Sequence, residues 1–234
     1  MKITKKTLAM TLALAFPSLA SATDLAYTFL DFAALDTSIK AEGTKTPVPG
    51  QTVSIDTIDG HGIAVAGSLV VHKGFYLGGF YKSSVVDLVG VVQSPLTTVN
   101  VKDTFDLVES SFSFGYLHAI GDKLDLVAEL LYDTSTYDFG SFAGENFDLD
   151  DSGVGGLIGF RWNPRREVEV FLTGRYSPVA KPLLTEGRYE SGTSVSAGLR
   201  WYFFENLGVG IEYESGEVDQ TTLSMRFSFG NLPW

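Results

Sequence analysis

Residues 110–132 read SSFSFGYLHAIGDKLDLVAELLY, and this stretch decides the fold of the chain. Apolar residues alternate with polar or small ones on both sides of a short AIGD segment at 119–122. A period of two places successive side chains on opposite faces, so the stretch predicts two antiparallel β-strands joined by a turn. Each strand then has one apolar face and one face that carries charges and glycines.

The same hairpin pattern occurs three more times, with turns predicted near 72–74, 163–166 and 204–206. Longer connections at about 36–60, 87–103, 135–151 and 178–192 have the composition of exposed loops. With one strand added at each end, the pattern predicts ten strands, and eight is the alternative count. The expected strands are 25–35, 61–71, 75–86, 104–118, 123–134, 152–162, 167–177, 193–203, 207–214 and 221–229.

Such strands need an apolar medium on one side and an enclosed polar space on the other. A closed barrel in a lipid bilayer supplies both. We therefore predict an all-β fold, a closed antiparallel up-and-down transmembrane β-barrel with short turns at one end and long loops at the other. A soluble β-sandwich is the alternative, and it conflicts with apolar rows such as Leu124, Leu126, Leu130 and Tyr132.

The first 22 residues have the features of a cleavable signal peptide. Lys2, Lys5 and Lys6 precede an apolar core at 8–16, and Ala20-Ser21-Ala22 forms a small-residue cleavage site. Residues 23–234 are then a single barrel domain. Losing three lysines and no acidic residue moves the formal net charge from −11 to −14. This balance argues against a nucleic-acid partner, and a chain without cysteine has neither disulfides nor thiolate metal sites.

The chain resembles the small outer-membrane β-barrel proteins of Gram-negative bacteria, the group of OmpA-like and opacity-like barrels. The resemblance is architectural and rests on the signal peptide, the alternating hairpins and the terminal strand LSMRFSF at 223–229. It implies residence in the outer membrane with both termini in the periplasm. It also implies contact with membrane lipid and lipopolysaccharide, and with the barrel-assembly machinery during biogenesis. In the usual pattern of these barrels the aromatic residue of the last strand is the final residue, whereas here five residues follow Phe229.

Charged residues on the polar faces form the sharpest candidate site. If the predicted turns are centred as expected, Arg161 lies opposite Glu169, and Arg200 lies opposite Glu212. Enclosed charges must be paired or hydrogen-bonded, so we expect a network that closes the lumen, with a gated ion path as the alternative. The predicted set is Glu129, Arg161, Glu169, Arg175, Arg200, Glu212 and Arg226.

Three other features are weaker candidates. His61 follows Asp59 and Gly60 on the long-loop side, where a general base is conceivable. The acidic stretch at 145–151 could bind calcium through Glu145, Asp148, Asp150 and Asp151, but it does not match an EF-hand, and we favour a solvated loop. The glycines at 153, 155, 156 and 159 are expected to relieve crowding in the lumen.

We therefore expect a structural or surface-interacting membrane protein without catalysis, cofactor or metal. A low-conductance pore is the first alternative, and a lipid-modifying enzyme is the second. The long loops could bind an extracellular ligand, but no motif identifies one.

Overall fold

A computed structural model describes residues 27–39, 44–48, 51–120, 122–142, 145–182, 189–216 and 218–229. The described residues contain no helix that is long and apolar enough to span a membrane. The predicted signal peptide and the tail after Phe229 lie outside the described residues. The strands, in chain order, are β1 (Phe29–Ile39), β2 (Thr44–Val48), β3 (Gln51–His72), β4 (Phe75–Ser94), β5 (Thr97–Ala119), β6 (Leu124–Phe142), β7 (Glu145–Arg165), β8 (Val168–Pro182), β9 (Tyr189–Phe204), β10 (Leu207–Ser215) and β11 (Val218–Ser228).

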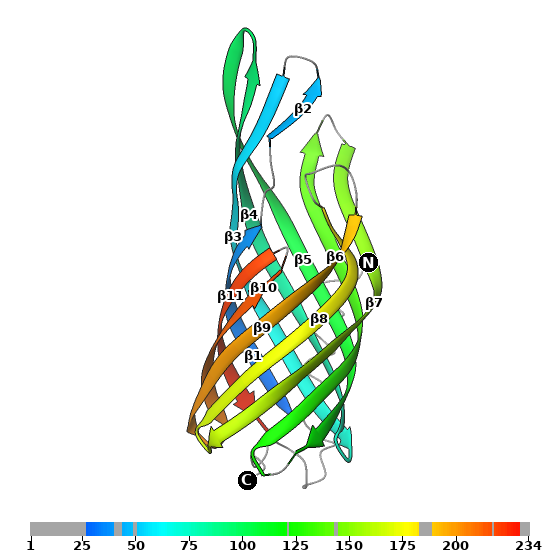
Figure 1. The fold of residues 1–234 in the computed structure, drawn as a ribbon, viewed down its shortest axis with the longest axis vertical. Coiled ribbons are helices and arrows are strands. Elements are labelled where there is room, and N and C mark those ends of the chain that lie inside the picture. The colour runs from blue at the N-terminus through cyan, green and yellow to red at the C-terminus, as the bar shows by residue number, and fades with distance from the viewer. Residues whose placement is uncertain are drawn as a thin grey trace, which may run out of the picture.

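The strands form one antiparallel sheet that closes on itself (Figure 1). β1 pairs with β11 on one side and with β3 on the other, and every other barrel strand pairs with its neighbours in the chain. The short β2 pairs only with β3 and lies outside the ring. The predicted closed up-and-down barrel of ten strands is confirmed.

The barrel wall is much taller on one side than on the other. β3 to β7 contain 19 to 23 residues each, whereas β10 contains 9 and β1 and β11 contain 11. A tilted strand needs about 9–11 residues to cross a bilayer. The short strands match that length, and the long strands continue beyond it, as the tall hairpin of β4 and β5 shows (Figure 1).

All four predicted long loops are wrong, because most of their residues are strand. β1, β2 and β3 contain most of 36–60, and β8 and β9 contain most of 178–192. β4 continues to Ser94 and β5 begins at Thr97, so little of the predicted loop at 87–103 remains. Likewise, β6 continues to Phe142 and β7 begins at Glu145 within the predicted loop at 135–151. Valine and threonine make up seven of the 17 residues at 87–103 and favour extended backbone, although the alternation that marks a lipid-facing strand is lost there.

The turns that join β3 to β4, β5 to β6, β7 to β8 and β9 to β10 lie together at one end of the barrel, and we call them the short turns (Figure 1). In the turn between β3 and β4, Lys73 and Gly74 both have positive φ angles, of 40° and 85°. This backbone matches the right-handed twist of the flanking strands. The turn predicted at 163–166 is displaced, because β7 continues to Arg165 and β8 begins at Val168.

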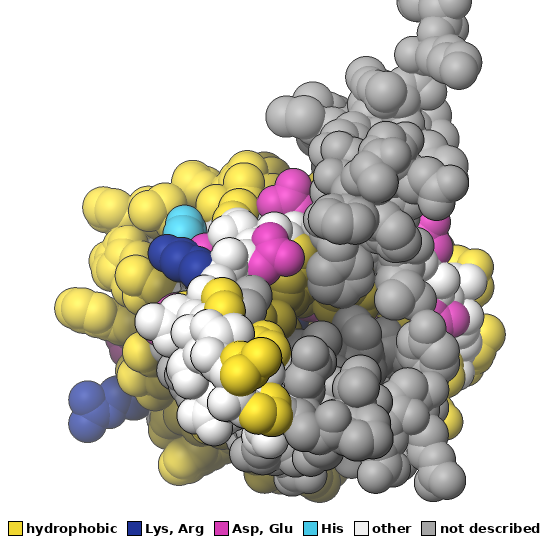
Figure 2. All heavy atoms as spheres, turned by 90° about the horizontal axis from the view of Figure 1, so that it is seen from above, with side chains coloured by type: hydrophobic (Ala, Val, Ile, Leu, Met, Phe, Trp, Pro, Cys, Tyr) yellow, Lys and Arg dark blue, Asp and Glu magenta, His cyan; other side chains and the backbone are white. Residues whose placement is uncertain are grey.

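The alternation assigns the two faces of the strands correctly. Leu130 on β6 is 61% exposed and Leu172 on β8 is 51% exposed, whereas Asp133 and Glu169 on the same strands are 3% and 2% exposed. Hydrophobic side chains accordingly surround much of the described outer surface (Figure 2). Aromatic rings pack on one another beside the short turns. The centroid of Phe75 lies 5.7 Å from that of Phe114 and 4.7 Å from that of Tyr116, and Trp201 lies 5.6 Å from Phe203. This matches the aromatic girdle of a membrane barrel.

The interior contains two apolar clusters and buried charged side chains. One cluster lies on the tall wall and consists of Ile58, Val86, Phe105, Leu107 and Tyr137. The other lies near the short turns and consists of Tyr76, Leu117 and Val127. A small barrel fills its interior with side chains in this way.

Candidate functional site: the charged lumen

Glu169 is the centre of the charged layer. It lies one residue after the start of β8, faces the lumen and is 2% exposed. Its carboxylate accepts hydrogen bonds from Arg161 Nη2 at 2.5 Å, from Arg200 Nη1 at 2.7 Å and from the Tyr202 hydroxyl at 3.2 Å. Arg226 Nη1 lies 3.8 Å from the same carboxylate. One acidic group therefore connects three arginines from β7, β9 and β11.

Asp31 is the second carboxylate of this layer and joins the first strand to the last. It lies directly opposite Arg226 in the pairing of β1 with β11. Arg226 Nε donates to both Asp31 oxygens, at 2.8 and 3.1 Å, and Nη2 donates at 2.6 Å. Arg200 Nη2 reaches the same carboxylate at 3.4 Å. This fork-shaped contact is the strong form of an arginine–carboxylate pair.

A second charged group lies farther from the short turns. Arg175 Nη2 donates to Asp133 at 2.7 Å, and the Ser177 hydroxyl donates to the other Asp133 oxygen at 2.7 Å. Lys82 Nζ donates to the side-chain oxygen of Gln220 at 2.7 Å and lies 3.6 Å from Glu214. The charges thus occupy two successive levels of the lumen.

Aromatic side chains hold both the carboxylates and the arginines in place. The Tyr76 hydroxyl donates to Glu129 at 2.6 Å, and the Tyr27 hydroxyl donates to Asp125. Arg161 lies over the ring of Tyr27 at 4.2 Å, and Arg226 lies over Phe29 at 3.5 Å. Stacking on a ring suits the weakly hydrated guanidinium in an enclosed site.

Glycines give these large side chains the space that they need. A Cβ on Gly115 would lie 2.2 Å from Tyr76 Cζ, and a Cβ on Gly198 would lie 2.2 Å from Phe171 Cζ. Of the glycines expected to relieve crowding, Gly159 directly faces Thr173, whose Cγ2 would lie 2.6 Å from an added Cβ. The large side chains and the glycines opposite them therefore form matched pairs across neighbouring strands.

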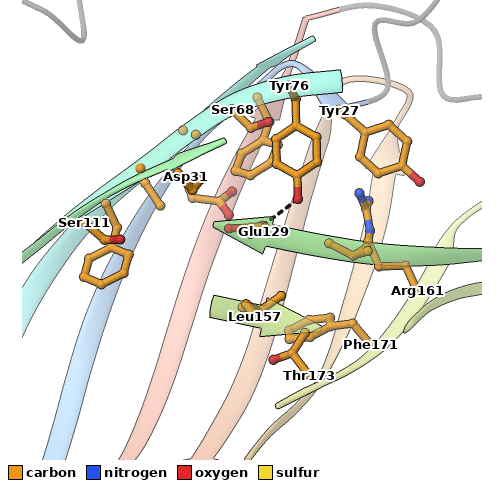
Figure 3. A pocket seen from close by; sticks show the side chains of 18 of the residues that line it. Tyr27, Asp31, Ser68, Tyr76, Ser111, Glu129, Leu157, Arg161, Phe171 and Thr173 are labelled. Carbon is orange, nitrogen blue, oxygen red and sulfur yellow. Dashed lines mark hydrogen bonds between the residues drawn. The ribbon is translucent and has the colours of Figure 1, made fainter. Parts of the chain in front are cut away.

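A cavity of about 280 Å³ remains between the two levels of charge. Its wall on β3 to β5 is built from small residues such as Ala66, Ser68 and Ser111, and its other walls carry the arginines. Figure 3 shows Tyr76 bonded to Glu129, with Arg161 beside Tyr27 and with Phe171 and Thr173 from β8. A much smaller cavity of about 30 Å³ is lined by Lys82, Glu109 and Glu214, and Arg175 lines both cavities.

The structure brings most of the predicted charges together, but not in the predicted register. Arg161 lies opposite Phe171 and reaches Glu169 diagonally, while Glu169 lies directly opposite Arg200. The displaced turn between β7 and β8 is the reason, and a shift of two residues keeps both side chains on the lumen face.

The second predicted pair is wrong. Arg200 lies opposite Gly210, and Glu212 lies opposite Gly198. Arg200 pairs instead with Glu169 and Asp31, and the described residues record no ion pair between Arg200 and Glu212. Glu129 contacts Tyr76, and Arg175 contacts Asp133, which the predicted set did not contain.

The remaining candidates are His61 and the acidic stretch at 145–151, and the side chains of Glu145 and Asp148 lie outside the described part of the chain. His61 is exposed on β3 and lies opposite Val85. Asp150 accepts a hydrogen bond from Thr136 at 2.6 Å across the hairpin of β6 and β7. Within the described ranges, no group of three or more histidine, aspartate or glutamate side chains has the arrangement of a metal site.

Comparison with solved structures places the fold among outer-membrane barrels. The β domain of the Bordetella autotransporter Brka matches with a TM-score of 0.50 and 11% identity, over 86% of this chain and 100% of that one. The transport unit of the autotransporter AIDA-I from Escherichia coli matches with a TM-score of 0.50 and 12% identity, over 96% and 97%.

Ail, the attachment invasion locus protein of Yersinia pestis, matches with a TM-score of 0.42 and 11% identity, over 86% and 97%. No protein-family model and no curated protein matches the chain. The two autotransporter barrels, at a TM-score of 0.50, share with this chain the architecture of an outer-membrane β-barrel, and the likeness concerns the fold alone.

Proposed function

We propose that the chain is an integral outer-membrane protein with a structural or surface-interacting role, a lumen closed by paired charges, and no catalysis. The observation that carries the proposal is the network around Glu169 and Asp31, in which two buried carboxylates hold three arginines across the lumen. Breaking such a network in an enclosed space is costly, because it leaves charges without partners. The closed barrel with an apolar outer belt supports residence in the membrane.

In this proposal the short turns and both termini face the periplasm, and the tall wall faces outward. Membrane lipid and lipopolysaccharide surround the barrel, the assembly machinery inserts it, and the elevated hairpins make any extracellular contact. A tag fused to the C-terminus should become accessible to antibody only after the outer membrane is permeabilised. A tag that is accessible on intact cells would contradict this orientation. Extraction from washed membranes without detergent would contradict membrane residence itself.

The second candidate is a low-conductance pore, because a cavity of about 280 Å³ adjoins the charge network. Planar-bilayer recording in concentrated potassium chloride distinguishes the two functions. A closed lumen predicts that the wild-type protein gives no steady single-channel steps. Steps that change in Arg161→Ala, but not in Lys73→Ala at the exposed turn between β3 and β4, would favour the pore.

A further inference from the structure

One cationic side chain at the short turns lies on the face of the barrel that contacts lipid. Arg165 is the last residue of β7, is exposed and pairs directly with Val168 of β8. On its other side, Val168 pairs with Trp201 of β9. The next pair of β7 and β8, farther from the turn, is Trp162 with Val170. Directly opposite residues of antiparallel strands share a face, so Arg165 belongs to the outer face together with both tryptophans.

The neighbours of Arg165 on this face are apolar. Trp162 and Trp201 are 49% and 55% exposed, and Val168 and Val170 are half-buried between them. An indole at the edge of a bilayer places its apolar body among acyl chains and its N–H among headgroups. The surface thus combines an apolar area for the chains of a lipid with one guanidinium at its edge.

Two more cations lie beside Arg165. Lys123 Nζ donates to a backbone carbonyl of the turn between β7 and β8 at 3.2 Å, so the turn between β5 and β6 contacts it. Arg166 follows Arg165 and is also exposed. The described residues record no ion pair of these three cations, although Asp122 and Glu167 belong to the same two turns. Three cations against two carboxylates leave positive charge that an anionic partner can compensate.

The opposite end of the outer face carries the opposite charge. Asp59 on β3 lies directly opposite Asp87 on β4. Asp106 on β5 lies directly opposite Asp138 on β6. Alternation places all four on the same face as the exposed apolar side chains of their strands. Carboxylates in these positions repel a phosphate, so the outer face attracts anionic lipid only toward its short-turn end.

We propose that the outer face around Arg165 binds the headgroup of an anionic glycerophospholipid, of the phosphatidylglycerol class. The guanidinium of Arg165 donates to the phosphate oxygens, and Lys123 and Arg166 attract the net negative charge. A zwitterionic phospholipid offers the same phosphate, but its own cation is repelled by this cluster. The inference rests on the proposed residence in the membrane and adds a preferred lipid to it.

The test is tryptophan quenching in phosphatidylcholine vesicles that contain the full chain and a lipid with brominated acyl chains. Trp234→Phe in every sample restricts the signal to the other two of the three tryptophans, Trp162 and Trp201. Because bromine quenches only at short range, these two report the lipids beside Arg165. We expect brominated phosphatidylglycerol to associate about tenfold or more strongly than brominated phosphatidylcholine. Equal quenching by the two lipids would overturn the proposal. No quenching by either would instead contradict membrane residence, and the proposal with it.

Two variants locate the preference on the barrel. Arg165→Gln should reduce it about fivefold, while brominated phosphatidylcholine still quenches and shows that the variant is inserted. Lys73→Gln is the matched control, an exposed cation at the same end, in the turn between β3 and β4. Four strand spacings separate the two turns, about 19 Å along the wall at about 4.8 Å each, which exceeds the Debye length of about 8 Å. A loss in Lys73→Gln equal to that in Arg165→Gln would also overturn the proposal.

Discussion

Substituting Glu169→Gln should destabilise the barrel more than any other conservative change in the lumen. The substitution keeps the size of the side chain and removes the charge that faces Arg161, Arg200 and Arg226. Among the described residues, Asp31 then still pairs with Arg200 and Arg226, and Arg161 loses its ion pair. Removing one partner of a buried ion pair costs about 3–5 kcal/mol, and we expect a loss of free energy of unfolding in that range.

The measurement is urea unfolding of the protein folded in detergent micelles, followed by tryptophan fluorescence. Trp162 and Trp201 are 49% and 55% exposed on the outer face, so they report release from the micelle. The matched control is Glu205→Gln in the exposed turn between β9 and β10, which should change stability by about 0.5 kcal/mol or less. A loss in Glu169→Gln no larger than in this control would refute the reasoning, because it would mean that water in the lumen screens the arginines.

Three further predictions use the same unfolding measurement. Gly198→Ala should cost about 1–3 kcal/mol by overpacking, because the new Cβ would lie 2.2 Å from Phe171 Cζ and 2.8 Å from the Ile211 carbonyl oxygen. Gly174→Ala has open space, and an equal loss there would contradict the steric explanation. Leu172→Arg places a charge on the outer face, away from the turns, and should cost about 2–4 kcal/mol, whereas Phe203→Arg beside the turn should cost about 0–1 kcal/mol, because the cost falls toward the edge of the bilayer. The reverse order would contradict our placement of the bilayer. Tyr76→Phe removes the 2.6 Å hydrogen bond to Glu129 and should cost about 1.5–3 kcal/mol. An equal loss in the control Tyr81→Phe, on the same strand, would contradict the assignment of this loss to the hydrogen bond.

Alternation in the sequence was sufficient to predict the fold and the faces of the strands. The reason is physical: a barrel in lipid exposes apolar side chains to one medium and encloses polar ones, so Leu172 and Glu169 cannot exchange sides. Strand length was not predictable in the same way. Beyond the lipid both faces of β4 and β5 contact water, so the alternation fades, although the strands continue.

The details of the charge network also exceeded what the sequence could specify. The distance along the chain from a turn gives the register only if the turn length is known, and the turn between β7 and β8 is shorter than expected. The contact between Asp31 and Arg226 depends on barrel closure and has no local signal. Its only trace in the sequence is that Asp31 falls on the same alternating face as Leu35.

The pairing of Asp31 with Arg226 has a consequence for how the barrel assembles. These residues are 195 positions apart, on the strands that meet last when the ring closes. A slip of one residue would turn Arg226 toward lipid, which costs about 2–4 kcal/mol near the midplane. A slip of two would place Asp31 opposite Ser224 or Ser228, and its fork-shaped contact with Arg226 would be lost. The charges in the lumen thus select the correct closing register, so the ring is strongly stabilised only when its first and last strands are correctly aligned.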